Sequence, residues 1–216
     1  MTNEATTPSV PTTVGILIFD DVEVLDFCGP FEVFSVAREP SPDGGRREEP
    51  LFRALTIAEK PGIVRCVGGL LVQPNHTIAD HPPLDVLVVP GGRGTRRERT
   101  NPAVLEWIKA QDGRTALTTS VCTGAFLLAA NGLLNGRRAT THWGSIDWLR
   151  EHHPAIDVRA DERVVDEGWI VTSAGISAGI DMALHLVGRL RGEAVAVETA
   201  RQMEYDWKRP SRVAAG

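Results

Sequence analysis

Short apolar segments rich in Val and Ile alternate along this chain with longer segments of helical pattern, and this alternation constrains the fold more than any other sequence feature. Strands covered on both faces have continuous apolar runs, and parallel strands need a long crossover, usually a helix, between them. The alternation therefore predicts an α/β fold with a mainly parallel sheet and helices on both faces. A chain of 216 residues is long enough to build one such core.

The expected elements follow from this pattern and from the Gly and Pro residues that interrupt it. Strands are expected at 14–19, 51–58, 85–89 and 115–119, with short strands at 138–140 and around Val158, Val164 and Ile170. Helices are expected from Gly29-Pro30 to Ala37, over 102–111, 125–130 and 144–151, and twice within 178–204. We expect a surface loop at 38–50 and either a hairpin or a bent ribbon at 63–72. Residues 1–13 are expected to form a flexible leader, 14–208 a single domain and 209–216 a polar tail.

Charge and cysteine usage narrow the functional classes. The net charge is −5, with 23 Lys and Arg against 28 Asp and Glu, so no basic excess favours nucleic-acid binding. No apolar run approaches the roughly 18 residues that span a bilayer, and the polar N-terminus lacks a signal-peptide pattern. Three cysteines (Cys28, Cys66 and Cys122) without CxxC spacing argue against a disulfide framework or a structural zinc site. We expect a cytoplasmic protein without a membrane or nucleic-acid partner.

Cys122 is the candidate nucleophile. It lies between small residues in the pattern Ser120-x-Cys122-x-Gly124, after a strand and before a helix, which predicts a nucleophile elbow. The positive end of the helix dipole would favour the thiolate and make Cys122 more acidic than an ordinary cysteine. The alternative interpretation is a buried cysteine that acts as a small apolar residue.

Residues at the carboxyl ends of the other strands could complete a site at this edge of the sheet. The N–H groups of Gly92 and Thr123 are candidate donors for developing negative charge, although Gly91-Gly92 alone would equally form a plain tight turn. Asp26 has apolar neighbours on both sides, which predicts a carboxyl group with a raised pKa; a helix cap is the alternative. Arg93 is interpreted here as a solvated loop charge.

His142 follows Cys122 by twenty residues and precedes Trp143, a position that suits either a residue orienting the thiol or a packed structural residue. The other histidines lack the spacing of metal ligands, so no metal site is predicted; these are His76, His81, His152, His153 and His185.

These residues together resemble the ThiJ/PfpI superfamily, whose fold is class I glutamine amidotransferase-like, and within it the isonitrile hydratase branch. The most specific segments are FDDVEVLDFCGPFEVF (19–34), VPGG (89–92), SVCTGAFLLAANGLLNGRRATTHW (120–143) and TSAGISAGID (172–181). The resemblance implies a flavodoxin-like sandwich, usually a homodimer. It also implies Cys122 as nucleophile, Asp26 as partner carboxylate and Thr123 beside the thiol, where related hydrolases carry His. Cys28 departs from the Thr more common in that branch and is expected near the pocket.

The resemblance implies hydration of isonitriles (R–NC) to N-substituted formamides through a Cys122 thioimidate, with Asp26 as acid and base and with water and the isonitrile as the only ligands. No cofactor is expected. Two alternatives remain open: another cysteine-dependent activity of the superfamily, either glyoxalase-like or protective, or a ligand-sensing domain like that of AraC-type regulators. Glyoxalase-like members usually carry Glu where Asp26 stands, and those regulators continue into a DNA-binding domain.

Overall fold

The computed structural model describes residues 10–43 and 45–209. Within them, a seven-stranded sheet has the order β10-β11-β7-β6-β1-β2-β5. The neighbouring strands of this sheet are parallel, apart from the antiparallel pair β10 and β11. The predicted α/β class with a mainly parallel sheet is therefore confirmed, and the likeness to flavodoxin-like folds with it.

The strands and helices have the following bounds. The main sheet contains β1 (Thr12–Leu17), β2 (Phe52–Ala58), β5 (His76–Thr77), β6 (Val86–Val89), β7 (Leu117–Val121), β10 (Val164–Asp166) and β11 (Ile170–Ser173). Two smaller sheets pair β3 (Val64–Arg65) with β4 (Leu71–Val72) and β8 (Arg138–Ala139) with β9 (Asp157–Val158). The α-helices are α1 (Val24–Val36), α2 (Thr95–Glu98), α3 (Pro102–Asp112), α4 (Ala125–Ala130), α5 (Ile146–His152), α6 (Ala178–Arg191) and α7 (Glu193–Gln202).

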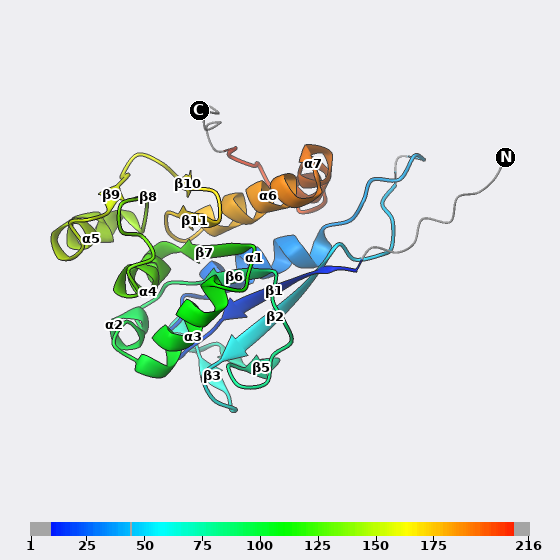
Figure 1. The fold of residues 1–216 in the computed structure, drawn as a ribbon. Helices are drawn as coiled ribbons and strands as arrows, with labels where there is room; N and C mark the ends of the chain where they lie inside the picture. Colours follow the sequence, from blue (N-terminus) through cyan, green and yellow to red (C-terminus); the bar gives the residue numbers. More distant parts are fainter. Residues whose placement is uncertain (1–9, 44, 210–216) are drawn as a thin grey trace.

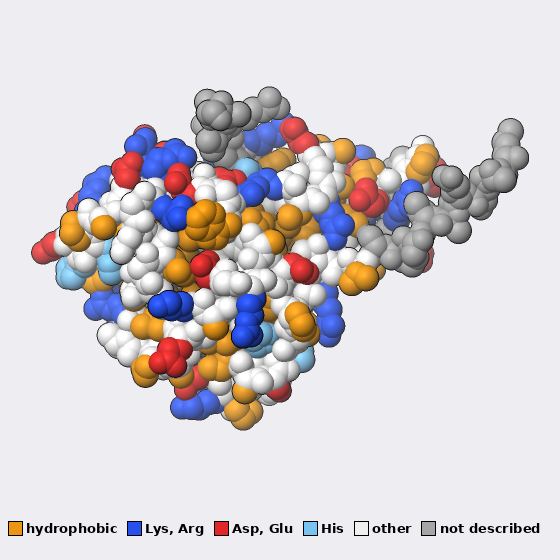
Figure 2. Space-filling view, in the orientation of Figure 1, with side chains coloured by type: hydrophobic (Ala, Val, Ile, Leu, Met, Phe, Trp, Pro, Cys, Tyr) orange, Lys and Arg blue, Asp and Glu red, His pale blue; other side chains and the backbone are white. Residues whose placement is uncertain are grey.

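Helices cover the sheet in two layers (Figure 1). Helices α1, α6 and α7 pack against one another on one face, while α2 and α3 pack on α4 on the other. The central strands between these layers are buried on both sides, and all four residues of the apolar strand β6 are fully buried. Apolar burial of this kind is the main stabilising contribution to such a core. On the face drawn in Figure 2, basic, acidic and apolar side chains are interspersed.

Two strands were predicted two residues away from their observed positions. Strand β1 begins at Thr12 and ends at Leu17, because Thr12 and Thr13 already pair with β2 although their side chains are polar. Strand β7 occupies 117–121, not 115–119, because its register with β6 begins at Leu117. Backbone pairing, unlike burial, requires no apolar side chain. Consequently β7 extends up to the residue before Cys122.

The start of the first helix was also predicted wrongly. We expected it at Gly29-Pro30, but α1 begins at Val24 and contains Pro30 in its interior. Proline inside a helix removes one backbone hydrogen bond and normally costs about 3 kcal/mol, yet here Phe27, Val33 and Phe34 on either side of it are buried in the core. The earlier start places Asp26 in the first turn of α1 and not in a loop.

The hairpin at 63–72 is confirmed as the pair β3 and β4. Most of the expected leader (1–13) and tail (209–216) lies outside the described residues. Within 10–43 and 45–209, no helix combines the length and the apolar character that crossing a bilayer requires.

Candidate active site

Cys122 lies at a sharp turn between β7 and a 3₁₀ turn (Cys122–Gly124) that leads into α4. Its φ of 57° is in the left-handed region, which is uncommon for residues other than glycine and costs about 1–3 kcal/mol. The turn is held on both sides: the Cys122 N–H donates to Ala174 O (3.3 Å), and the Thr141 hydroxyl donates to Cys122 O (2.7 Å). The strand-turn-helix arrangement expected of a nucleophile elbow is therefore present.

Asp26 reaches the same edge of the sheet from α1 and is 0% exposed. Its Oδ2 accepts a hydrogen bond from the Gly91 N–H (3.0 Å), whereas no described protein atom donates to its buried Oδ1. Burial raises the pKa of Asp26 to about 7, and the charge of Glu23 adds to this, although hydrogen bonds from Cys122 and Gly91 oppose it. The neutral form would carry its proton on Oδ1, because Oδ2 already accepts from Gly91.

The Cys122 thiol is less acidic than the sequence led us to expect. Burial raises its pKa, and the charge of Asp26 raises it further, while the N–H and hydroxyl of Thr123 favour the thiolate and lower it. The backbone donors at the elbow are therefore outweighed by desolvation. Since two negative charges would be costly together in this buried setting, the Cys122–Asp26 pair carries at most one negative charge near neutral pH.

Thr123 joins the elbow to the turn that follows β6. Its Oγ1 accepts a hydrogen bond from the Gly92 N–H (3.0 Å) and lies 3.2 Å from Gly92 O. The Thr95 hydroxyl lies 3.1 Å from Thr123 Oγ1 and 2.7 Å from Gly92 O. Thr95 is fully buried, and the sequence analysis missed it because a Thr among charged loop residues carries no distinctive signal.

The glycine N–H groups thus have protein partners. Gly91 donates to Asp26 and Gly92 donates to Thr123, so both glycines position the site, and neither N–H is free for a ligand in this structure. The N–H of Thr123 is the backbone donor that acts on the Cys122 sulfur. We therefore revise the expected oxyanion donors from Gly92 and Thr123 to Thr123 alone.

His142 lies beside Cys122. A Cβ placed on Gly175 would lie 3.1 Å from both Cys122 Sγ and His142 Cγ, so the absence of a side chain at 175 lets the two groups approach each other. His142 Nδ1 accepts a hydrogen bond from the Gly144 N–H (3.2 Å). A neutral ring that accepts at Nδ1 carries its proton on Nε2 and can donate to a ligand from there.

A cavity of about 170 Å³ opens above the thiol. It is lined by Glu23, Gly92, Arg93, Arg96, Cys122, Thr123, His142, Ser145 and Ile176. Arg93 therefore faces the cavity and is more than a solvated loop charge. Arg96, Ser145 and Ile176 were not expected, because they lie on separate segments of the chain whose convergence depends on tertiary packing.

Cys28, which was expected near the pocket, is not among the residues that line this cavity, and neither is Asp26 on the same helix. Burial raises the pKa of the Cys28 thiol, and Cys28 is close enough to Cys66 to raise the pKa of that thiol as well. Among the described residues, no group of three or more His, Cys, Asp or Glu is arranged to hold a metal ion.

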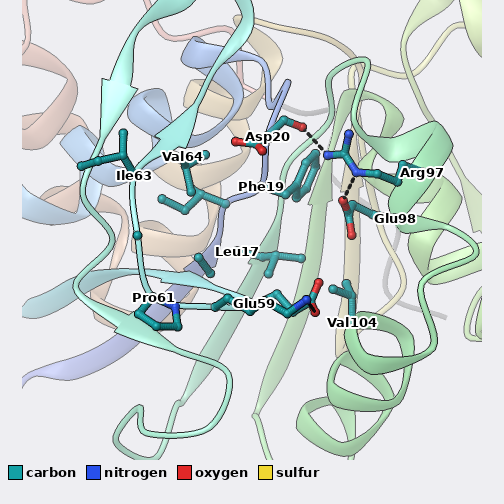
Figure 3. Close-up of a pocket in the computed structure, with 14 residues that line it drawn as sticks. Leu17, Phe19, Asp20, Glu59, Pro61, Ile63, Val64, Arg97, Glu98 and Val104 are labelled. Carbon is teal, nitrogen blue, oxygen red and sulfur yellow. Dashed lines mark hydrogen bonds and ion pairs between the residues drawn. The ribbon is translucent and has the colours of Figure 1, made fainter.

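A second, larger cavity of about 260 Å³ lies beside the carboxyl ends of β1 and β2 (Figure 3). Its floor is apolar, with Leu17, Phe19 and Val64, and it has no cysteine. The charged groups on its rim are paired with one another: Arg97 lies 2.7 Å from Glu98 and also donates to Asp20 O (2.8 Å). The smaller cavity, which has a nucleophile and an adjacent buried carboxyl group, is the better candidate for catalysis.

The close approach of the Gly91 backbone to the site leads to a prediction. A Cβ on Gly91 would lie 2.6 Å from Thr123 N and 2.8 Å from Asp26 Oδ2, so Gly91→Ala would push apart the groups around the thiol. We expect turnover to fall about 100-fold or more, since displacements of about 1 Å have such effects. The measurement is the steady-state rate of turnover of the Gly91→Ala variant. Gly113→Ala is the control, because a Cβ on Gly113 would contact only Ala110 O, at 3.8 Å. Equal rates in the two variants would contradict this account.

We next compared the sequence and the fold with those of known proteins. The sequence profile described as the DJ-1/PfpI family matches residues 12–189. An isonitrile hydratase from Pseudomonas putida is 36% identical over 193 residues, which cover 89% of this chain and 78% of that protein. The HTH-type transcriptional regulator CdhR from Pseudomonas aeruginosa is 32% identical over 177 residues, 82% of this chain but only 52% of the regulator. A crystal structure of a ThiJ/PfpI family protein from Pseudomonas syringae has a TM-score of 0.79 at 28% identity and covers 98% of this chain and 82% of that one.

Proposed function

Because the chain belongs to the DJ-1/PfpI family, we propose that within this family it is an isonitrile hydratase that converts R–NC to the formamide R–NH–CHO. The observation that carries the proposal is the pairing of the elbow residue Cys122 with the buried Asp26, whose pKa is about 7. Hydration of an isonitrile requires a nucleophile and a group that both gives and takes a proton near neutral pH, and this pair supplies both.

In the first half of the reaction, the thiol proton passes to the Asp26 carboxylate as the Cys122 sulfur bonds to the terminal carbon of the isonitrile. Asp26 then delivers that proton to the same carbon, which gives the thioimidate R–N=CH–S–Cys122 and leaves Asp26 ionised. The Thr123 N–H stabilises the sulfur while it is anionic. The pair carries one negative charge or none at each step, as its burial demands.

In the second half, ionised Asp26 takes a proton from water as the water oxygen attacks the thioimidate carbon. Asp26 passes this proton to the nitrogen and then accepts the proton of the new hydroxyl group as the C–S bond breaks. This releases R–NH–CHO and leaves the Cys122 thiolate beside protonated Asp26. Asp26 then returns the proton to the sulfur, which restores the thiol and the ionised carboxylate, so atoms and charges balance over the cycle. His142, which lines the cavity, would orient the substrate or the water through its Nε2–H.

The finer expectations accompany this proposal: residues 14–208 form a single domain, the protein is a cytoplasmic homodimer, and the reaction needs no cofactor. The curated relatives also include regulators, and the chain spans about half the length of the regulator CdhR. A ligand-sensing role and a glyoxalase-like activity are therefore the outcomes against which the proposal is tested.

The test is production of N-substituted formamide by the purified protein from one aliphatic and one aromatic isonitrile, with methylglyoxal as the competing substrate. We expect formamide to form in proportion to enzyme, at a rate far above that of the buffer, and no lactate from methylglyoxal. Lactate without formamide would support a glyoxalase-like enzyme. If neither formamide nor lactate forms but the protein binds a small molecule saturably, the result would support a ligand-sensing role.

A further inference from the structure

Two arginines on the turn after β6 face the Cys122 cavity without an ionic partner. Arg93 and Arg96 line the cavity, and among the described residues neither forms an ion pair with a carboxylate. The guanidinium of Arg96 donates to Gly92 O (3.2 Å), which leaves further N–H groups unused. The next arginine along the chain differs: Arg97 is paired with Glu98 and lies in the other cavity (Figure 3).

These guanidinium groups lie at the rim of the cavity and not at its base. Cys122 and Thr123 are buried, whereas Arg93 and Arg96 are exposed. The ionisation of the thiol responds to burial, to Asp26 and to Thr123. Glu23 also lines the cavity, so its charged lining consists of two guanidinium groups and one carboxylate. The rim of the cavity therefore has a positive excess.

We propose that the substrate is an anionic isonitrile, an isocyano carboxylate whose carboxylate binds Arg93 and Arg96 while its isonitrile carbon meets Cys122. This inference rests on the proposed function, because it names the R group of the same reaction. Guanidinium groups bind carboxylates with paired, charge-assisted hydrogen bonds, and they do so better than lysine because of their planar fork. A cavity of about 170 Å³ suits a compact molecule in which few bonds separate the two groups.

The first test compares isocyanoacetate with its methyl ester, which differ in charge but share the reacting group. In the native protein we expect kcat/KM to be about tenfold or more higher for the acid. A tenfold difference corresponds to about 1.4 kcal/mol, which one charge-assisted hydrogen bond can supply. Arg93→Gln and Arg96→Gln should each lower the acid-to-ester ratio about tenfold.

Arg53→Gln is the matched control. It removes one positive charge from an exposed position near the amino end of β2, at the opposite edge of the sheet from the site. We expect it to leave the acid-to-ester ratio within twofold of the native value. An acid-to-ester ratio near one in the native protein, or an equal fall in all three variants, would overturn the proposal.

The second test does not depend on hydration. Cys122 is alkylated with the anionic iodoacetate or with the neutral iodoacetamide, and peptide mass spectrometry shows which residue is modified. The ratio of the iodoacetate rate to the iodoacetamide rate is then divided by the same ratio for free cysteine. We expect this normalised ratio to exceed one and to fall about tenfold in Arg93→Gln and Arg96→Gln. A fall in the ratio without isonitrile turnover would reject the hydratase and keep the anion-binding rim. If both isonitriles are turned over but neither the acid-to-ester ratio nor the normalised alkylation ratio changes in the arginine variants, the anion-binding role of the rim is rejected and the proposed hydratase activity stands.

Discussion

Replacing Cys122 with alanine is expected to abolish isonitrile hydration, with formamide production falling to the rate of the buffer. The proposed reaction forms and breaks a bond at this sulfur, so no part of the catalytic cycle can proceed without it. Serine at 122 should be almost as inactive, because a hydroxyl group is a far weaker nucleophile than a thiolate under the same conditions. The measurement is formamide formation by liquid chromatography, with isonitrile in excess.

Controls for this variant come from the other two cysteines. Cys28 is half-buried and Cys66 is buried, and neither lines the Cys122 cavity. Cys28→Ala and Cys66→Ala should therefore retain formamide production, and an unchanged circular dichroism spectrum would show that Cys122→Ala remains folded. Turnover that persists in Cys122→Ala, or that disappears only with Cys28, would exclude the mechanism proposed above.

Much of the fold was predictable because its periodic signals are local. Strand β6 is a continuous apolar run buried on both faces, and Gly68-Gly69 interrupts the β3–β4 hairpin as a turn should. The errors arose where tertiary packing or strand pairing overrode the local preference of a residue. Pro30 suggested a helix start, but its buried neighbours hold it inside α1, and Thr12 joins β1 although its side chain is polar.

The candidate site was predictable only in part. Cys122, Asp26 and Thr123 each carry a local signal in small or apolar neighbours, and the structure brings all three together. Thr95 and Arg96 carry no such signal, because their role depends on how the turn after β6 folds back onto the elbow. The acidity of Cys122 was mispredicted for a similar reason: a helix terminus can be seen in the sequence, whereas desolvation cannot.

Asp26→Asn is expected to change three properties that depend on the native carboxyl group: turnover, the reactivity of the Cys122 thiol and the pH dependence of stability. Turnover should fall about 10²–10⁴-fold, because asparagine can neither deliver nor accept the proton in the cycle. Alkylation of Cys122 by iodoacetamide at pH 7 should become faster, since the charge of Asp26 is one cause of the raised pKa of that thiol. A variant with a more reactive thiol and lost turnover would show that Asp26 acts in proton transfer. Slow alkylation would indicate instead that the site had collapsed.

The same substitution should remove a pH dependence of stability. Because the pKa of Asp26 is raised from 3.8 to about 7 on folding, the folded state binds its proton more tightly than the unfolded state does. That contribution to stability is complete below about pH 4 and is lost as pH rises to about 7, with a loss on the order of 3 kcal/mol between pH 5 and 8. An asparagine side chain does not titrate, so we expect the melting temperature of Asp26→Asn, relative to the native protein, to increase by several degrees from pH 5 to pH 8. Parallel melting curves for the two proteins across this range would mean that folding does not raise the pKa of Asp26, and Asp26 would then lack the ability to give and take a proton near neutral pH on which the proposed function rests.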